Sequence, residues 1–241
     1  MSKSKHSPSI VILTGAGISA ESGLDTFRGA SADGGGVWSK YRLEEVATPE
    51  AFASDPEFVH GFYNARRAAL IDVKPNAAHK ALARLEADWA GTMTIVTQNV
   101  DDLHERGGSK AIIHMHGELR SAWCKACDAR FAWLEELSVD SVCTRCNSTG
   151  SVRPDVVWFG EMPYQMHQIY ELLEGCDVFA AIGTSGNVYP AAQFVQHAAQ
   201  YGAETFELNL EPTDLARAFH RNSYGKASEI VPDWVERLLR D

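Results

Sequence analysis

The cysteines carry the most specific chemical pattern in the chain. Cys124 and Cys127 form one C-x2-C pair, and Cys143 and Cys146 form a second pair after fifteen intervening residues. Each pair can place two thiolates on one tetrahedral ion, and four sulfurs leave no open position for water. The spacing therefore predicts one structural zinc ion, and four unrelated buried thiols are a much poorer explanation. Cys176 stands apart and is predicted to be an inert core residue.

A glycine turn follows the first apolar run of the sequence. Residues 9–14 are short, apolar and β-branched, and they lead directly into Gly15-Ala-Gly-Ile-Ser-Ala20. This fits the pattern G-x-G-x-x-G/A, in which the backbone approaches a pyrophosphate at a helix N-terminus. A dehydrogenase of the ordinary kind would carry an acid on a second strand about 20 residues later. Glu44 and Glu45 lie near that distance but on no clear strand, so a dinucleotide site is favoured and a plain dehydrogenase is not.

Polar side chains follow a second predicted strand, residues 92–97. Gln98, Asn99 and Asp101 come directly after it. Ligands of open α/β sheets bind at the carboxyl ends of the strands. These side chains suit hydrogen bonds to ribose hydroxyls and a carboxamide. A turn with a helix cap at Asn99 and Asp101 is the alternative interpretation.

Two histidines, His114 and His116, flank Met115 just before Gly117. In a strand they would point to the same face. One explanation is that both are ordinary histidines of the core or the surface, with their hydrogen bonds satisfied and no role in function. A zinc role is not needed, because four cysteines already complete a site. His116 can instead serve as a positioned base near neutral pH.

The predicted elements alternate between strands and helices. Strands are expected at 9–14, 92–97, 177–182 and 204–209, and helices at 76–89, 163–173 and 190–201. This alternation predicts an α/β fold with a doubly wound, Rossmann-like parallel sheet. Two segments interrupt it and are expected to form a smaller module. The predicted division is 1–27, 76–118 and 153–241 for the large domain, 28–75 for a loop and helical insert, and 119–152 for the zinc module.

Composition and charge exclude several classes of partner. The 241 residues carry a net charge of −10, which disfavours binding to nucleic acid or to an anionic membrane. No run approaches the ~20 apolar residues of a membrane span, and residues 1–8 do not resemble a signal peptide. A cytoplasmic location is therefore expected. A non-catalytic zinc ribbon for nucleic acid is disfavoured, because Lys125, Arg130 and Arg145 are the few basic residues near the cysteines.

The motifs occur together in the order found in the sirtuin family. Besides the glycine turn, the two cysteine pairs and the His116-Gly dipeptide, the chain carries Thr97-Gln-Asn-Val-Asp101, Gly183-Thr-Ser185 and Asn209-Leu-Glu211. The chain resembles this family from about residue 10 to residue 227. The resemblance implies an NAD-dependent protein-lysine deacylase that consumes NAD and yields nicotinamide, O-acyl-ADP-ribose and free lysine. Mono-ADP-ribosyl transfer from the same site is the alternative. The oligomeric state stays open, with a monomer as one option.

The resemblance also implies roles for individual residues. His116 matches the general base of the family. Thr26 stands where many relatives have Asp, and the loop from 29 to 38 is long and rich in glycine. The positions matching NAD contacts are Gly15, Ala16, Gly17, Ser19, Phe27, Arg28, Gln98, Asn99, Val100, Asp101, Gly183, Thr184, Ser185, Asn209, Leu210, Glu211 and Ala227.

Two further groups resemble the family's substrate contacts. The segment with Val157, Phe159, Gly160 and Glu161 resembles the one to which a substrate peptide adds as a strand. Tyr63 and Arg66 lie three apart on a predicted helix and share a face. Composition alone favours the interpretation that Tyr63 is half-buried and that Arg66 beside it is solvated. They also resemble the acyl-pocket pair of the branch that removes succinyl and malonyl groups, since an Arg fork and a phenol suit a distal carboxylate. Deacetylation is expected alongside.

Overall fold

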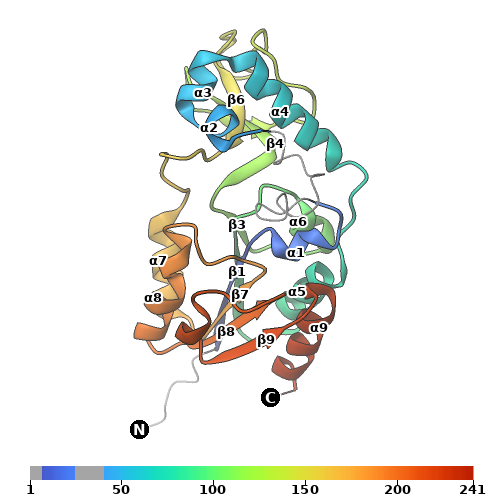
Figure 1. The fold of residues 1–241 in the computed structure, drawn as a ribbon, viewed down its shortest axis with the longest axis vertical. Coiled ribbons are helices and arrows are strands. Elements are labelled where there is room, and N and C mark those ends of the chain that lie inside the picture. The colour runs from blue at the N-terminus through green and yellow to red at the C-terminus, as the bar shows by residue number, and fades with distance from the viewer. Residues whose placement is uncertain (1–6, 25–40, 241) are drawn as a thin grey trace.

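The computed structural model describes residues 7–24 and 41–240. Figure 1 shows a large lobe built on one sheet and a smaller lobe, with α1 and α6 near the junction between them. The helices are α1 Gly17–Ala20, α2 Leu43–Val46, α3 Pro49–Ser54, α4 Pro56–Ala69, α5 Ala77–Asp88, α6 Leu103–Gly107, α7 Met166–Gly175, α8 Phe194–Gln200 and α9 Ala227–Leu238, with short 3-10 helices at Ala191–Gln193 and Ala216–Ala218. The strands are β1 Ser9–Thr14, β2 Thr92–Thr97, β3 Ile112–His114, β4 Gly117–Cys124, β5 Arg130–Ala132, β6 Val152–Val156, β7 Val178–Ile182, β8 Glu204–Asn209 and β9 Arg221–Tyr224.

The large lobe contains a six-stranded parallel sheet in the order β3-β2-β1-β7-β8-β9. β1 lies in the middle, and its neighbours belong to opposite halves of the sequence. Three predicted strands, 9–14, 92–97 and 204–209, are confirmed, and the fourth begins one residue later than predicted, at Val178. The doubly wound parallel fold is therefore confirmed.

The alternating side chains of β1 supply both faces of this sheet. Ile10 and Ile12 pack with α5 and α9, in a cluster that includes Leu82 and Trp234. Val11 and Leu13 point to the other face, in a cluster with Phe194 and other residues of α7 and α8. Because both faces are covered, every residue of β1 after Ser9 is buried, as expected for a central parallel strand.

One of the three predicted helices begins where its cap indicates, and two begin later. Asn76 accepts a hydrogen bond from the Ala78 N–H and caps α5, as predicted. The helix predicted from residue 163 begins only at Met166, so that prediction was wrong at its start. The Tyr164 N–H donates to the Met115 carbonyl and the Tyr164 hydroxyl donates to Asp155, which holds this segment away from the helix axis. The helix predicted from residue 190 starts as a 3-10 helix at Ala191 and becomes α-helical, as α8, only at Phe194.

The small lobe combines α2, α3 and α4 with a three-stranded antiparallel sheet in the order β5-β4-β6. One core lies between the helices and the sheet and includes Phe62, Leu119 and Trp158. β6 belongs to this sheet, so the predicted limits of the zinc module, 119 and 152, fall within β4 and at the first residue of β6. The division of the chain into domains stays a prediction.

The four cysteines of the two pairs gather at the far end of this sheet. All four Sγ atoms lie within 4.8 Å of one another, and none is in a disulfide. The Cys124–Cys146 and Cys127–Cys143 sulfur distances are 3.7 and 3.8 Å. A tetrahedral zinc ion with bonds of about 2.3 Å separates its sulfurs by about 3.8 Å. The geometry therefore fits the predicted zinc ion.

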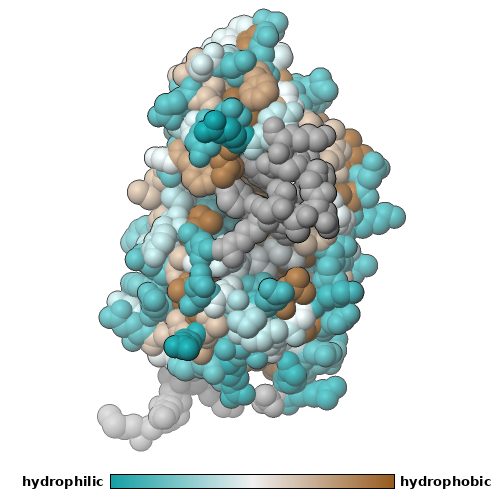
Figure 2. Space-filling view, viewed as in Figure 1, coloured by the Kyte–Doolittle hydropathy of each residue, from teal (hydrophilic) through white to brown (hydrophobic). Residues whose placement is uncertain are grey.

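Within the described residues, no helix is long and apolar enough to cross a membrane. On the face drawn in Figure 2, hydrophobic and hydrophilic residues are interspersed. Large exposed apolar side chains occur at scattered positions, among them Ile71, Leu134 and Met162.

We predict that the purified protein holds about one zinc ion per chain. Cys143→Ser should lower both the zinc content and the melting temperature, because metal binding is coupled to the folding of this module. Metal analysis and thermal unfolding measure the two effects. Cys176→Ser is the matched control, since Cys176 is also buried but packs in the core of the large sheet. An unchanged metal content and melting temperature in Cys143→Ser would contradict the assignment.

Candidate functional site

The glycine turn after β1 packs against the loop after β7. The Gly17 N–H donates to the Gly183 carbonyl over 2.8 Å, and the Gly15 N–H donates to the Ile182 carbonyl. Gly183 has a φ of +61°, and a Cβ on it would lie 2.3 Å from the Ile18 nitrogen. Side chains at these glycines would push the two loops apart. The contact lies where β1 and β7 end side by side, which is the point at which open α/β sheets bind ligands.

A buried polar network joins the glycine turn to the loop after β2. The Ser19 hydroxyl donates to Asp101 Oδ2 over 3.0 Å and accepts from Asn99 Nδ2 over 3.2 Å. The Leu103 N–H donates to the other carboxylate oxygen of Asp101. Burial raises the pKa of Asp101, although these hydrogen bonds act in the opposite direction. The structure thus brings together three side chains that the sequence placed in one site.

A second set of contacts joins the same loop to β7 and β8. Gln98 Nε2 donates to the Thr184 hydroxyl over 2.9 Å, and Asn209 Nδ2 donates to the Thr184 carbonyl over 2.7 Å. Ser185 is partly buried beside them, whereas the Leu210 side chain is 65% exposed.

The remaining predicted NAD contacts lie at the periphery of this sheet edge or outside the described residues. Glu211 is exposed, and Val100 is partly buried. Ala227 begins α9, and the next residue, Ser228, donates to the Glu21 carboxylate at the end of α1. Phe27 and Arg28, together with Thr26 and the loop 29–38, lie outside the described residues.

Sequence reasoning missed several residues that support this edge. Thr14 donates to Thr97 over 2.8 Å, and both hydroxyls are fully buried at the ends of β1 and β2. Asn76, predicted only as a cap, also donates to the Ile18 carbonyl, and His79 lies 3.4 Å from the Ser19 hydroxyl. The only signal in the sequence is that threonines end both strands.

His116 lies between the two lobes. Its Nδ1 is 3.1 Å from the Gln98 carbonyl, which can only accept a hydrogen bond, so Nδ1 carries the proton and Nε2 keeps its lone pair. Burial lowers the pKa of His116, and the bond to Gln98 offsets this only in part. The Val157 N–H donates to the His116 carbonyl over 2.9 Å. A neutral imidazole is therefore held beside the predicted substrate segment, in the tautomer that a base requires.

His114 has a different environment. Its Nδ1 lies 3.3 Å from the Asn99 carbonyl, and its Nε2 lies 2.6 Å from a Glu105 oxygen. Burial by itself lowers the pKa of His114, but Glu105 and the nearby Glu118 raise it overall. The positively charged form is stabilised there, so of the two histidines only His116 is suited to accept a proton.

The predicted substrate segment follows β6 and folds into a turn, in which the Glu161 N–H donates to the Trp158 carbonyl over 3.0 Å. The Phe159 N–H donates to the Ala47 carbonyl, and the Phe159 side chain is 49% exposed. Gly160, with a φ of +87°, turns the chain at an exposed position. The Glu161 carboxylate, which is predicted to contact substrate, accepts hydrogen bonds from Arg153 and from the Trp158 N–H.

Tyr63 and Arg66 lie one turn apart on α4. Tyr63 is only 3% exposed, so it is fully buried and not half-buried as its composition suggested. Its hydroxyl accepts a hydrogen bond from the Trp158 indole over 2.9 Å. Burial raises the pKa of Tyr63 to about 12, against an opposite effect of the Arg66 charge. The phenol therefore stays protonated at neutral pH.

The residues at the sheet edge fit NAD. A serine, two amides and a carboxylate offer the donors and acceptors that ribose hydroxyls and a carboxamide need, and the close packing of Gly17 on Gly183 brings the loops after β1 and β7 to the same edge.

Comparison with known proteins agrees with this geometry. Two curated proteins named NAD-dependent protein deacylase are similar to this chain over at least 95% of its length. The one from Caulobacter vibrioides is 54% identical, covering 95% of this chain and 96% of its own, and the one from Escherichia coli K12 is 50% identical, covering 97% and 83%.

Solved structures are similar as well. A mutant Sir2 homologue in complex with ADP-ribose matches with a TM-score of 0.86 and 40% identity, over 96% of this chain and 92% of its own. A Sir2 structure bound to an acetylated peptide matches with a TM-score of 0.80 and 29% identity, over 95% and 92%. The Sir2 family model matches residues 15–190, and this chain belongs to the Sir2 family.

Proposed function

We propose that this protein removes acyl groups from lysines of other proteins, with NAD consumed as co-substrate. The observation that carries the proposal is the position of His116. The Gln98 carbonyl accepts a hydrogen bond from its imidazole, its own carbonyl accepts one from the Val157 N–H, and burial lowers its pKa. One residue thus connects the nucleotide-binding edge to the substrate segment. The relatives named NAD-dependent protein deacylase support the same reaction.

NAD supplies an ADP-ribosyl group, which captures the acyl oxygen as nicotinamide departs. The protein positions the reactants and moves one proton. The Gln98 carbonyl holds the His116 ring through Nδ1, so that Nε2 can take a proton from a ribose hydroxyl. Ser19, Asn99 and Asp101, fixed by one another, hold the ribose and carboxamide without needing to reorganise.

The substrate peptide would lie along the segment that begins at Val157. Backbone groups of this segment can pair with an extended peptide irrespective of its side chains. The exposed Phe159 lies beside it and offers apolar contact. Because four cysteines are arranged to hold a zinc ion and no cysteine is in a disulfide, we place the reaction in the reducing cytoplasm.

We further propose that succinyl and malonyl groups are removed as well as acetyl groups. Each carries a carboxylate that must leave water to enter the acyl channel, and an unpaired charge there is costly. Arg66 can offer two parallel N–H groups, and the neutral phenol of Tyr63 can offer an O–H.

We predict that His116→Ala abolishes deacylation of an acetyl-lysine peptide while the protein still folds and binds ADP-ribose. A general base of this kind contributes ~10²–10⁴-fold to the rate. Nicotinamide release and calorimetric titration measure the two properties. His167→Ala is the control, since the side chain of His167 is 91% exposed. Turnover by His116→Ala within a few-fold of wild type would remove His116 from the mechanism.

We predict that Arg66→Met lowers desuccinylation relative to deacetylation, mainly through KM. A hydrogen bond to a charged group is worth ~1.5–3 kcal/mol, which corresponds to roughly 10–150-fold. Tyr63→Phe should have a smaller effect of the same kind. Steady-state kinetics on one peptide sequence carrying either acyl group measure the ratio. A parallel fall of both activities would show that the pair serves helix packing, and the acyl preference would be wrong.

A further inference from the structure

The hydrogen bond from Trp158 to Tyr63 joins two residues 95 positions apart in the sequence. The indole N–H donates over 2.9 Å, and the two side chains are 2% and 3% exposed. An indole N–H can only donate, so the phenol oxygen is the acceptor and the phenol hydrogen must point elsewhere. We propose that Trp158 is a specificity-determining positioning residue, which orients the Tyr63 hydroxyl as a donor to an acyl carboxylate. This inference rests on the proposed desuccinylase function.

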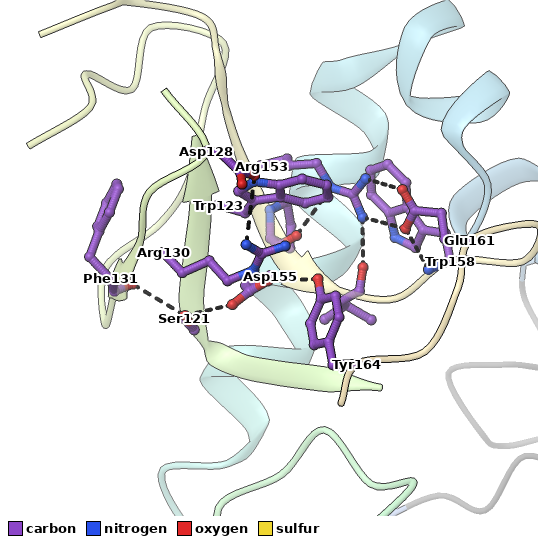
Figure 3. Close-up of polar contacts among 12 residues, drawn as sticks. Ser121, Trp123, Asp128, Arg130, Phe131, Arg153, Asp155, Trp158, Glu161 and Tyr164 are labelled. Atoms are coloured by element: carbon purple, nitrogen blue, oxygen red, sulfur yellow. Dashed lines mark hydrogen bonds and ion pairs between the residues drawn. The ribbon is translucent and has the colours of Figure 1, made fainter. Parts of the chain in front are cut away.

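Trp158 is itself held on several sides. The guanidinium carbon of Arg153 lies 3.3 Å from the centroid of the Trp158 ring. Arg153 is 2% exposed and donates to both oxygens of Glu161, over 2.7 and 3.0 Å. Glu161 in turn accepts the Trp158 backbone N–H over 2.9 Å. Figure 3 shows Arg153 and Glu161 gathered at Trp158. The indole therefore has little freedom to turn away from Tyr63.

The zinc module contributes to the same arrangement. Trp123 on β4 lies 5.0 Å from the Arg153 guanidinium, so Arg153 contacts tryptophans from both β4 and the substrate segment (Figure 3). Arg153 also donates to the Val156 carbonyl at the end of β6. The position of the Trp158 indole thus depends on the three-stranded sheet, and through Trp158 so does the orientation of the phenol.

The donor role matters for only one class of acyl group. An acetyl group ends in a methyl group, which forms no hydrogen bond with the phenol. A succinyl or malonyl group ends in a carboxylate, which accepts hydrogen bonds and cannot donate them. A phenol that already accepts from Trp158 donates more strongly, because hydrogen bonds in a chain polarise one another. Arg66, one turn further along α4, supplies the positive charge.

The test compares variants of Trp158 on one peptide carrying either a succinyl or an acetyl group. Trp158→Phe removes the N–H together with part of the ring. Incorporation of 3-benzothienylalanine at position 158 keeps the size of the ring and replaces the N–H with sulfur. A net hydrogen bond of this kind corresponds to about a 2- to 12-fold effect. We expect both variants to lower the succinyl-to-acetyl ratio of kcat/KM by that factor, through KM for the succinyl peptide. An unchanged ratio with the isosteric residue overturns the proposal.

A double-mutant cycle tests whether the effect passes through the phenol. In a Tyr63→Phe background, replacement of Trp158 by 3-benzothienylalanine should change the ratio no further. An equal fall in that background would mean that Trp158 acts through packing, which also overturns the proposal.

The failure of the proposed function has a different signature. Wild-type protein that removes neither acyl group in the presence of NAD would contradict the function and the inference together. Wild-type protein that removes succinyl groups in an Arg66-dependent way, with a ratio insensitive to Trp158, would contradict the inference alone.

Discussion

The backbone contact between Gly17 and Gly183 is the constraint on which the site depends. It brings the loops after β1 and β7 within hydrogen-bond distance, and a Cβ at either glycine would lie within 3 Å of the opposite backbone. On the other side of β1, the Gln98 N–H donates to the Thr14 carbonyl over 2.9 Å, which places the loop after β2 beside the same turn. Ser19, on the helix that follows the glycine turn, then reaches Asn99 and Asp101. The arrangement of polar side chains at this edge of the sheet thus depends on Gly17 and Gly183, which have no side chains.

His116 and the zinc module connect the polar edge of the large sheet to the predicted substrate segment of the small lobe. His116 is bound to the Gln98 loop of the large lobe, and β4 begins at the next residue. Cys124 is the last residue of β4, so the metal site lies at one end of this strand and His116 immediately precedes the other end. The zinc ion we infer is remote from the reaction but holds the sheet that presents the substrate segment. A metal with four protein ligands suits that structural role.

Much of this arrangement could be predicted from the sequence, because it depends on local patterns. Short strand-like runs between helical patterns predicted three strands to the residue, and the C-x2-C spacing predicted the sulfur cluster. The exceptions depend on contacts between distant residues. The start of α7 shifts because Tyr164 is bound to Met115 and Asp155.

The burial of Tyr63 is a second exception of this kind. It depends on Trp158, which lies 95 residues away, and no local pattern in α4 indicates such a partner. The helix period correctly placed Tyr63 and Arg66 on one face. It could not show that the phenol already accepts a hydrogen bond, which is the feature that decides what the phenol can offer to a ligand.

The central claim is that this edge transfers an acyl group from lysine to ADP-ribose. The most direct measurement is the product balance, by mass spectrometry, of an acyl-lysine peptide incubated with NAD and the protein. We expect one free-lysine peptide, one nicotinamide and one O-acyl-ADP-ribose for each NAD consumed. Nicotinamide release with the acyl-lysine left intact and ADP-ribose attached to protein would contradict the claim.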